Sequence, residues 1–503
     1  MKKIFSMNSI FDYFLKKDSK FYLLVLIILL ASFLRLYNFP YRYSLGDESV
    51  RDAVIGIEGA RELQLPLTGA FSSLGPFTFG PWYAYQLGIS TLLFRSILSP
   101  WIYLTIISIV YVFIMYKIGS LLEGKNFGLI LALIAAISPA QVISATHLTS
   151  HNTTNLFAVL AIWFFLILVL KKRSYWLGFF LGFVIGIGIN LHFQMVGLLV
   201  LPLILFIYNR KKYMYFLTAA AGVLASFLPL FFFEVNNHWF NTRNLIYYMF
   251  YGKNLMYVPN RWLFYLRDFW PSFWADALGG PVWIGNVVIV FVLILLAWSI
   301  YKKKLKLQVW LLLLAFIINF IILRYYWGPR FFGYLNFMRP FVFIFTTFAI
   351  VRLSQTKVGK LGAALLLILI IGTSIPRNIS QLIRDPFSME MYKGMSDLEK
   401  TYPNSNFTLY TCSTTYKTAT NATNYSTLFI LELKHKLSSN GIRIGFKSDC
   451  NYPDKKTYPS LSSIGILDFS STTDLALKNN GWKIITFQEI YESYARWWFR
   501  LKP

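Results

Sequence analysis

Long apolar runs separated by short polar connections occupy the first three quarters of the chain. A helix needs roughly 17 to 25 residues to cross a hydrocarbon layer of about 30 Å. Runs of about that length begin near Phe21, Pro100, Phe127, Thr153, Tyr175, Gln194, Tyr213, Pro281, Leu307, Pro340 and Gly359. The pattern predicts a polytopic α-helical membrane protein with about eleven transmembrane helices.

Basic residues mark every second connection between these runs. They lie in the amino-terminal segment and at residues 117–125, 171–173, 210–212, 302–306 and 352–360. Because Lys and Arg concentrate in cytoplasmic connections, this alternation predicts a cytoplasmic amino terminus. It also requires the apolar and aromatic stretch 81–94 to lie in the membrane interface instead of crossing the bilayer.

Composition supports a membrane protein and argues against nucleic acid as a partner. The 503 residues are 56% hydrophobic and 19% aromatic, which is more apolar surface than a soluble domain can hide. The formal net charge is +26, but the Lys and Arg lie in short clusters between apolar runs and form no basic domain. We therefore expect contacts with membrane lipids and none with nucleic acid. The first run, residues 21–37, is long for a signal peptide and is expected to be retained.

The composition changes after about residue 375. Short alternating runs at 407–410, 442–446 and 464–467 predict strands, and residues 428–437 and 487–499 predict helices. We expect a transmembrane domain, residues 1–375, followed by a small extracytoplasmic α/β domain, residues 376–503. The only cysteines, Cys412 and Cys450, fall in this second domain. A disulfide between them and two buried free thiols are both open.

An acidic pair directly follows the first apolar run. Asp47 and Glu48 lie at its expected outer end, and apolar residues recur at helical spacing from there to Ile57. The spacing predicts a short amphipathic helix on the membrane that begins with the two acids. Carboxylates at that depth suit general-base chemistry, because desolvation and like charge tune their proton affinity. The alternative is structural: Asp47 caps the helix and pairs with Arg51.

Polar side chains in the later outer connections are candidates for binding a substrate. They are His147, His151, Asn152, His192, Glu234, Arg243, Arg330, Tyr334 and Arg339. Arginine matches phosphate oxygens well, although each of these arginines could instead anchor the protein at the interface. His147 and His151 are spaced to share a helix face, where they could hold a divalent metal with Asp47 or Glu234. Hydrogen bonding to substrate is the favoured interpretation, and no cofactor is assigned.

Glycines elsewhere do not indicate a nucleotide site. The chain has no Walker loop, and Gly182, Gly186 and Gly188 lie within an apolar run. This pattern predicts close helix packing through small residues, which disfavours a nucleotide-linked donor.

Together these motifs resemble a known group of enzymes. The segments GDESVRDA at 46–53 and GPFTFGPWY at 75–83 are similar to GT-C membrane glycosyltransferases, most closely glycosyltransferase family 39, the dolichyl-phosphate-mannose protein mannosyltransferase type. The segments at 227–244 and 330–340 resemble that group's later outer loops, so the resemblance covers about residues 20–375. It implies sugar transfer from a polyprenyl-phosphate donor to a protein, lipid or glycan hydroxyl at the outer face of the plasma membrane, with inversion. It also implies that Asp47, of the pair with Glu48, is the catalytic carboxylate.

Two other classes remain open at this stage. A transporter or lipid flippase would carry charged residues in the middle of several spans, whereas Arg35 and Arg324 lie near outer ends. Within the enzymes, a transferase similar to the aminoarabinose transferases of lipid A is the alternative. The sequence identifies neither the donor sugar nor the acceptor.

Overall fold

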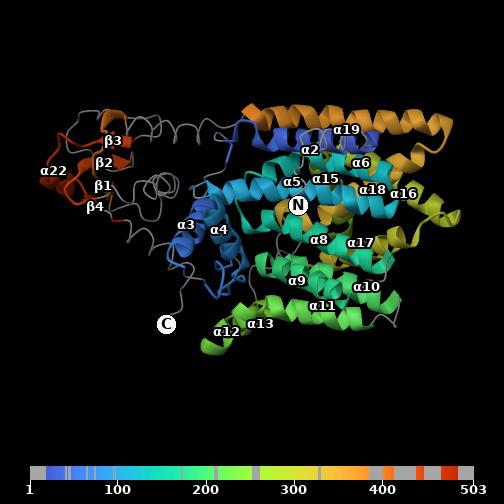
Figure 1. Cartoon of the computed structure of the whole chain (residues 1–503), viewed down its shortest axis with the longest axis horizontal. Helices are drawn as coiled ribbons and strands as arrows, with labels where there is room; N and C mark the ends of the chain where they lie inside the picture. Colours follow the sequence, from blue (N-terminus) through green and yellow to red (C-terminus); the bar gives the residue numbers. More distant parts are fainter. Residues whose placement is uncertain are drawn as a thin grey trace, which may run out of the picture.

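A computed structural model describes residues 18–39, 42–43, 47–63, 66–72, 75–94, 96, 98–170, 174–208, 213–251, 261–326, 330–383, 400–412, 438–446, 466–484 and 486. Most of the helices run side by side in one body, and a small sheet lies beyond one end of it (Figure 1).

The body consists mainly of long apolar helices. Among the described residues, seven are long and apolar enough to cross a membrane: α2 (Ser19–Leu36), α5 (Ser99–Leu122), α8 (Ser150–Leu170), α16 (Val282–Tyr301), α17 (Leu307–Tyr325), η5 (Phe332–Met338) joined to α18 (Arg339–Leu353), and α19 (Lys357–Ile383). The pair α11 (Tyr213–Ser226) and α12 (Leu228–Asn236) also passes, with a bend of 52°. This confirms a polytopic α-helical membrane protein.

Three shorter apolar segments complete the predicted set. They are α6 (Lys125–Ile137), α9 (Tyr175–Leu191), and η2 (Phe193–Leu199) continued by α10 (Val200–Tyr208). A helix or helix pair therefore stands at each of the eleven expected positions. That these three also cross the membrane stays a prediction.

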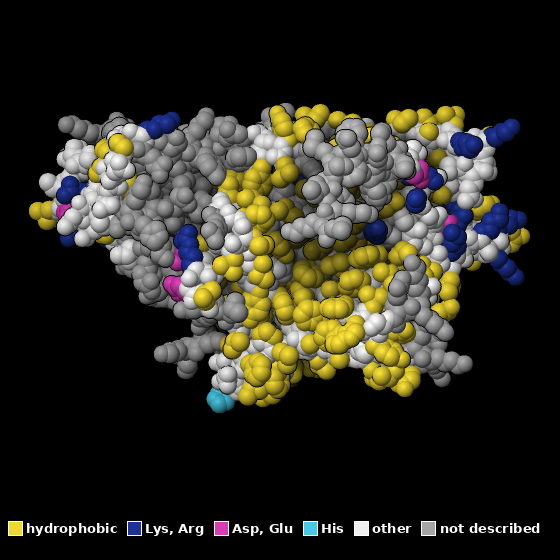
Figure 2. Space-filling model, viewed as in Figure 1, with side chains coloured by type: hydrophobic (Ala, Val, Ile, Leu, Met, Phe, Trp, Pro, Cys, Tyr) yellow, Lys and Arg dark blue, Asp and Glu magenta, His cyan; other side chains and the backbone are white. Residues whose placement is uncertain are grey.

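Salt bridges bring the basic connections together at one end of the body. Lys125 lies 3.6 Å from Asp18 at the start of α2, while Lys306 and Arg352 lie 3.2 and 2.9 Å from Glu123. Figure 2 shows Lys and Arg gathered at this end, with a broad apolar surface between it and the opposite end. This is the arrangement that the alternation of basic connections requires, and we call it the basic end.

Two short helices lie across the opposite end (Figure 1): α3 (Asp47–Arg61) and α4 (Trp82–Phe94). α3 buries Val50, Val54 and Ile57 completely, as its amphipathic spacing predicts. Between the two helices, residues 69–72 and 75–80 pair as a hairpin: Gly69 N donates to the Phe79 carbonyl at 2.8 Å, and Phe79 N donates to the Ala70 carbonyl at 3.0 Å. We call this the hairpin end. That residues 81–94 lie in the interface and do not cross the bilayer stays a prediction.

Further short elements complete this end and the body: α7 (Pro139–Ser144), α13 (Phe240–Tyr251), α14 (Arg261–Phe264), the π-helix η4 (Tyr265–Phe269) and α15 (Trp270–Leu278).

Close packing of α9 on α11 confirms the interpretation of the glycines. A Cβ atom on Gly182 would overlap the carbonyl oxygen of Ala219, and one on Gly186 would overlap the Ser226 hydroxyl. Only a hydrogen atom fits between these helices.

The carboxyl-terminal sheet has the order β3-β2-β1-β4, built from β1 (Phe407–Cys412), β2 (Ile442–Phe446), β3 (Ile466–Asp468) and β4 (Trp482–Ile484). β1 and β2 are parallel, and the two outer pairings are antiparallel. The helix α22 (Asp474–Asn479) contributes Leu477 to a core with Tyr410, Phe469 and Trp482. The sheet is the small α/β unit that the sequence predicts.

Some predictions for this region are confirmed and others are not tested. The three predicted strands are present, whereas β4 and α22 are additional. The predicted helices at 428–437 and 487–499, and the pairing of Cys412 with Cys450, lie outside the described residues and side chains. α19 continues to Ile383, eight residues beyond the boundary expected at residue 375.

Candidate active site

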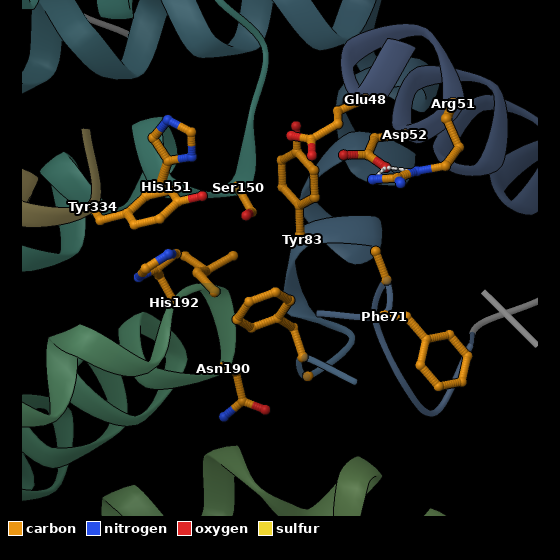
Figure 3. Close-up of a pocket in the computed structure, with 15 residues that line it drawn as sticks. Glu48, Arg51, Asp52, Phe71, Tyr83, Ser150, His151, Asn190, His192 and Tyr334 are labelled. Atoms are coloured by element: carbon orange, nitrogen blue, oxygen red, sulfur yellow. Dashed lines mark hydrogen bonds and ion pairs between the residues drawn. The ribbon is translucent and has the colours of Figure 1, made fainter. Parts of the chain in front are cut away.

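A polar pocket opens at the hairpin end between α3 and the turns that follow α9 and precede α18. It encloses about 610 Å³. Glu48, Arg51 and Asp52 of α3 form one side, and His151, His192 and Tyr334 form the other (Figure 3). Phe79, Gly80 and Asn190 also line the pocket. Segments far apart in the sequence thus meet around one space: α3, the hairpin, the start of α8, the end of α9 and η5.

The α3 side holds a tightly paired arginine. Arg51 Nη2 lies 2.7 Å from Asp52 Oδ1, and Nε donates to the same oxygen at 2.8 Å. The two side chains are only 16% and 5% exposed. Burial acts to lower the pKa of Arg51, but the Asp52 carboxylate outweighs it and raises that pKa. Arg51 is therefore charged and oriented by its ion pair with Asp52. The pair with Asp47 that the structural alternative expects involves a side chain outside the described part.

Tyr83 of α4 stands beside these acids. Its ring is buried, and its hydroxyl has no hydrogen-bond partner in the described part of the chain. Burial raises the pKa of Tyr83 well above its usual value, and the charge of Asp52 adds to this. Tyr83 is consequently a neutral donor next to the exposed carboxylate of Glu48 (Figure 3).

The opposite side is a cluster of aromatic rings with polar edges. The ring centroid of Tyr334 lies 5.4 Å from that of His151 and 4.6 Å from that of His192, while Phe79 stacks on His192 at 5.8 Å. Thr149 Oγ1 lies 3.2 Å from His151 Nε2. Burial lowers the pKa of His192 to about 4, so this imidazole is neutral near pH 7. A neutral imidazole can donate one hydrogen bond and accept another.

Two buried amides hold this wall in place. Asn336 Nδ2 donates to the His151 carbonyl at 2.8 Å and to Asn152 Oδ1 at 3.1 Å, and Asn152 Nδ2 donates to the His147 carbonyl at 2.7 Å. Asn152, expected to bind substrate, thus joins the start of α8 to η5. His147 is exposed and does not line the pocket.

The hairpin forms the floor of the pocket and needs glycine at one position. Gly80 N donates to the Asn190 carbonyl at 2.9 Å, and a Cβ on Gly80 would overlap the Asn190 side chain. Asn190 Nδ2 donates to the Gly186 carbonyl at 2.8 Å, which leaves Oδ1 buried without a partner among the described residues. The GPFTFGP motif is therefore explained by close contact between the hairpin and α9.

A second, apolar pocket of about 660 Å³ lies on the other face of the hairpin. Phe77, Phe193, Phe227, Phe231, Trp239 and Leu245 supply most of its wall. The ring centroids of Phe193 and Phe77 are 5.7 Å apart, and those of Phe193 and Phe79 are 5.0 Å apart. These rings separate the apolar pocket from the polar one.

Glu234 lies at this apolar pocket and not at the polar one. Its two carboxylate oxygens accept backbone N–H groups of Asn241 and Thr242, each at 2.9 Å, and so cap α13. Asn241 in turn accepts from Thr78 N at 2.8 Å and donates to Thr78 Oγ1 at 2.7 Å. These contacts give Glu234 a structural role, because they fasten α13 to the hairpin.

The arginines proposed from the sequence lie outside the polar pocket. Arg330 donates to three backbone carbonyls at the end of α17, and Arg243 is exposed on α13. Arg339 is buried, 3.1 Å from Asp276 Oδ2. Among the arginines in the described part of the chain, it is Arg51 that lines the polar pocket.

Glu48, His151, His192 and Tyr334 are brought together as the sequence suggests, whereas Asp52 and Tyr83 were missed. Asp52 follows Glu48 by four residues, so helical spacing alone places both on one face of α3. Asp47 is the first residue of α3, but its side chain lies outside the described part. Among the described residues, no three His, Cys, Asp or Glu side chains form a metal-binding group.

Comparisons with known proteins bear on this architecture. Residues 78–233 match the family described as dolichyl-phosphate-mannose-protein mannosyltransferase. A search of curated proteins finds no match.

Solved structures give broader matches. ArnT from Cupriavidus metallidurans in the apo state has a TM-score of 0.56 at 10% identity, covering 84% of this chain and 92% of that one. ArnT bound to undecaprenyl phosphate has the same TM-score and coverage at 11% identity. The apo oligosaccharyltransferase of Archaeoglobus fulgidus has a TM-score of 0.51 at 15% identity, covering 78% of this chain but only 59% of that one. The chain has the fold that the sequence predicts.

Proposed function

We propose that this chain, a membrane glycosyltransferase of the GT-C class, transfers a sugar from a polyprenyl-phosphate donor to an acceptor hydroxyl at the outer face of the plasma membrane. The observation that carries the proposal is the polar pocket, where Glu48 and Arg51 face His151, His192 and Tyr334. Such a transfer needs a base, a cation for the leaving phosphate and a surface for the sugar. The pocket contains groups suited to each need.

In the proposed reaction, the acceptor hydroxyl gives its proton to a carboxylate while its oxygen forms a bond to the anomeric carbon. The bond from that carbon to the phosphate oxygen breaks, and its electron pair leaves with the polyprenyl phosphate. Attack from the face opposite the phosphate inverts the anomeric carbon. Asp47 is the proposed base on the strength of the resemblance, and Glu48 orients the acceptor from within the pocket.

Arg51 is the proposed partner of the leaving phosphate, in place of Arg243, Arg330 and Arg339. Negative charge grows on the phosphate as its bond to the sugar breaks, and a guanidinium fork stabilises that charge. The ion pair with Asp52 uses Nε and Nη2 of Arg51, so Nη1 keeps its donors. Asp52 thereby acts as a positioning residue.

The aromatic cluster is the proposed sugar site. His151, His192 and Tyr334 present flat faces and hydrogen-bonding edges toward the space between them and Glu48 (Figure 3). Because His192 is neutral, its ring can accept a hydrogen bond from a sugar hydroxyl.

The apolar pocket is the proposed place for the first isoprene units of the donor. An amphiphilic donor needs a polar and an apolar compartment side by side. Phe79 lines the polar pocket and contacts Phe193, which lines the apolar one with Phe77. The ArnT structure that contains undecaprenyl phosphate supports this class of ligand.

A transfer assay tests the proposal. The full chain is reconstituted in nanodiscs with a panel of radiolabelled polyprenyl-phosphate hexoses and pentoses, together with an extract of membrane acceptors. Lipid-linked sugars that accumulate in a deletion strain identify which donor to use. We expect Asp47→Asn to lower turnover about 10² to 10⁴-fold, because general-base catalysis contributes that much.

Glu62→Gln is the matched control, because Glu62 is an exposed acid just after α3 that does not line the pocket. It should transfer sugar at the wild-type rate, while Glu48→Gln should be impaired. Wild-type turnover in both Asp47→Asn and Glu48→Gln, with thermal unfolding unchanged, would contradict the proposed site.

A further inference from the structure

A third pocket lies at the basic end, a full helix away from the polar pocket. Lys117 near the end of α5, Trp163 and Ile167 of α8, and Ser174, Trp176 and Phe180 at the start of α9 line it. It is a groove open to the surroundings, with a space of about 1130 Å³ that includes its open side. Fourteen residues of α5 separate Lys117 from Tyr103, whose hydroxyl bonds to α4 at the hairpin end, and they span about 21 Å. The pocket has no part in the proposed transfer.

Lys117 is the charged residue among the described residues that line this pocket; the others are apolar apart from Ser120 and Ser174. Lys117 is half-buried, and its Nζ lies 5.1 Å from the Phe113 ring centroid. The described residues that line the pocket include no carboxylate, and Glu123 at this end already pairs with Lys306 and Arg352. The charge of Lys117 therefore faces a pocket whose described walls hold no acid to neutralise it.

The start of α9 adds a positive potential on the same side. The Ser174 side chain accepts from Trp176 N and fixes the first turn of this 17-residue helix. The amino-terminal end of a helix carries a partial positive charge. Lys117 and the start of α9 thus present positive potential to one pocket.

The depth of the pocket matches that of a lipid headgroup. Lys117 precedes Glu123 by six residues of α5, so it lies about 9 Å inside the polar end of the bundle. Trp176 and Phe180 are 68% and 48% exposed on the flank of the body. A ligand here has its charge near the interface and its apolar part along α8 and α9.

We propose that this pocket binds one anionic glycerophospholipid from the leaflet at the basic end. Its phosphate pairs with Lys117 near the start of α9, and one acyl chain lies along Trp163, Ile167 and Phe180. Charge complementarity favours an anionic over a zwitterionic lipid, because no carboxylate among the described residues of the pocket can pair with a choline. A free phosphate would leave the apolar walls in contact with water.

Thermal unfolding of the purified full chain tests the proposal. Phosphatidylglycerol or phosphatidylcholine is titrated into the same detergent micelles. We expect phosphatidylglycerol to raise Tm more than phosphatidylcholine does. Lys117→Gln should weaken the apparent affinity for phosphatidylglycerol about fivefold, because one basic residue near an anionic lipid contributes about 1 kcal/mol. Lys117→Arg should retain it.

Lys302→Gln is the matched control, because Lys302 is an exposed lysine of the same end that lies over the Tyr301 ring. It should bind phosphatidylglycerol as the wild type does. Equal weakening in Lys117→Gln and Lys302→Gln would mean diffuse surface attraction and would overturn the site. The same holds if phosphatidylcholine or inorganic phosphate raises Tm as much as phosphatidylglycerol.

Ile167→Trp tests the acyl part independently. The larger side chain narrows the apolar wall while Lys117 stays in place, so phosphatidylglycerol affinity should fall although the charge is unchanged. It also decides the question if Lys117→Gln does not fold. Unaltered affinity in Ile167→Trp would show that no acyl chain lies in the pocket. Because none of these residues is near Glu48, sugar transfer should be normal in every variant.

Discussion

Two pairs of arginine and carboxylate, one at each end of the helical body, differ in what they connect. At the basic end, Arg352 and Lys306 both pair with Glu123 and tie the ends of three helices together. At the hairpin end, Arg51 pairs with its own neighbour in the sequence, Asp52, which connects no separate elements. Because this ion pair links no separate helices, stabilising the fold does not account for it.

The difference indicates where chemistry takes place. Bridges between helices fix the fold, and the basic end carries the charge pattern that orients a membrane protein. The pair on α3 instead holds a guanidinium at the edge of a pocket that also contains Glu48 and Tyr83. The same ionic contact is therefore structural at one end and, in our proposal, catalytic at the other.

The largest expected effect comes from breaking the pocket pair. Arg51→Gln should lower turnover about 10² to 10³-fold, because one preorganised donor at a developing charge contributes that much. Arg51→Lys should recover only part of the activity, since an ammonium cannot hold Asp52 and a phosphate in the same fork geometry. The rate of sugar transfer at saturating donor measures this. Full activity in Arg51→Gln would show that Arg51 has no role in the reaction.

Breaking the pair at the basic end should give the reverse result. Arg352→Gln should lower the free energy of unfolding by about 2 kcal/mol, because a charged hydrogen bond is lost while Lys306 still neutralises Glu123. Turnover per folded molecule should not change. Thermal unfolding and the transfer assay on the same samples measure both; a loss of turnover with an unchanged Tm would contradict the division between the ends.

The packing of α9 on α11 affects the polar pocket, because the last turn of α9 carries Asn190 and is followed by His192. Gly182→Ala should destabilise the fold by about 1 to 3 kcal/mol, since the added methyl group overlaps the Ala219 carbonyl oxygen. Gly372→Ala in α19 is the control: an added Cβ there meets no atom within 4 Å, so that variant should gain about 0.5 kcal/mol or more. Equal Tm values for the two variants would show that α9 and α11 are less tightly packed.

The smallest effect is a pH dependence at the hairpin end. The pKa of His192 falls from 6.5 to about 4 in the folded protein, so the unfolded chain binds the proton first as the pH drops. The contribution of neutral His192 to the free energy of unfolding is complete above pH 6.5 and is lost progressively between pH 6.5 and about 4. From pH 7.5 to 5.5 the loss is about 1 kcal/mol. Tm measured across this range should fall less in His192→Asn than in the wild type; parallel curves would disagree with a buried neutral ring.

Much of the fold could be predicted from the sequence, because each apolar run is long enough to define a helix by itself. The amphipathic spacing of α3 and the glycines of α9 likewise act locally, and both predictions are confirmed. β4 and α22 were missed because segments of 3 and 6 residues carry too little periodicity. Short elements depend on the neighbours that cover them.

The site was predicted in part. Glu48, His151, His192 and Tyr334 meet because they lie on segments that converge at the hairpin end of the bundle. The sequence could not show which arginine joins them, since Arg330 and Arg339 reach their partners only through tertiary packing. The role of Glu234 was also ambiguous, because a carboxylate at a helix end can either cap a helix or bind a sugar. Its contacts in the structure are those of a helix cap.

The most direct test of the central claim is the side of the membrane that the polar pocket faces. In a background with Cys412→Ser and Cys450→Ser, Glu62→Cys reports on the hairpin end and Lys302→Cys on the basic end. We predict that a membrane-impermeant maleimide labels Glu62→Cys in intact cells and labels Lys302→Cys only after lysis. Labelling of Lys302→Cys in intact cells, with Glu62→Cys protected until lysis, would place the pocket in the cytoplasm and contradict transfer at the outer face.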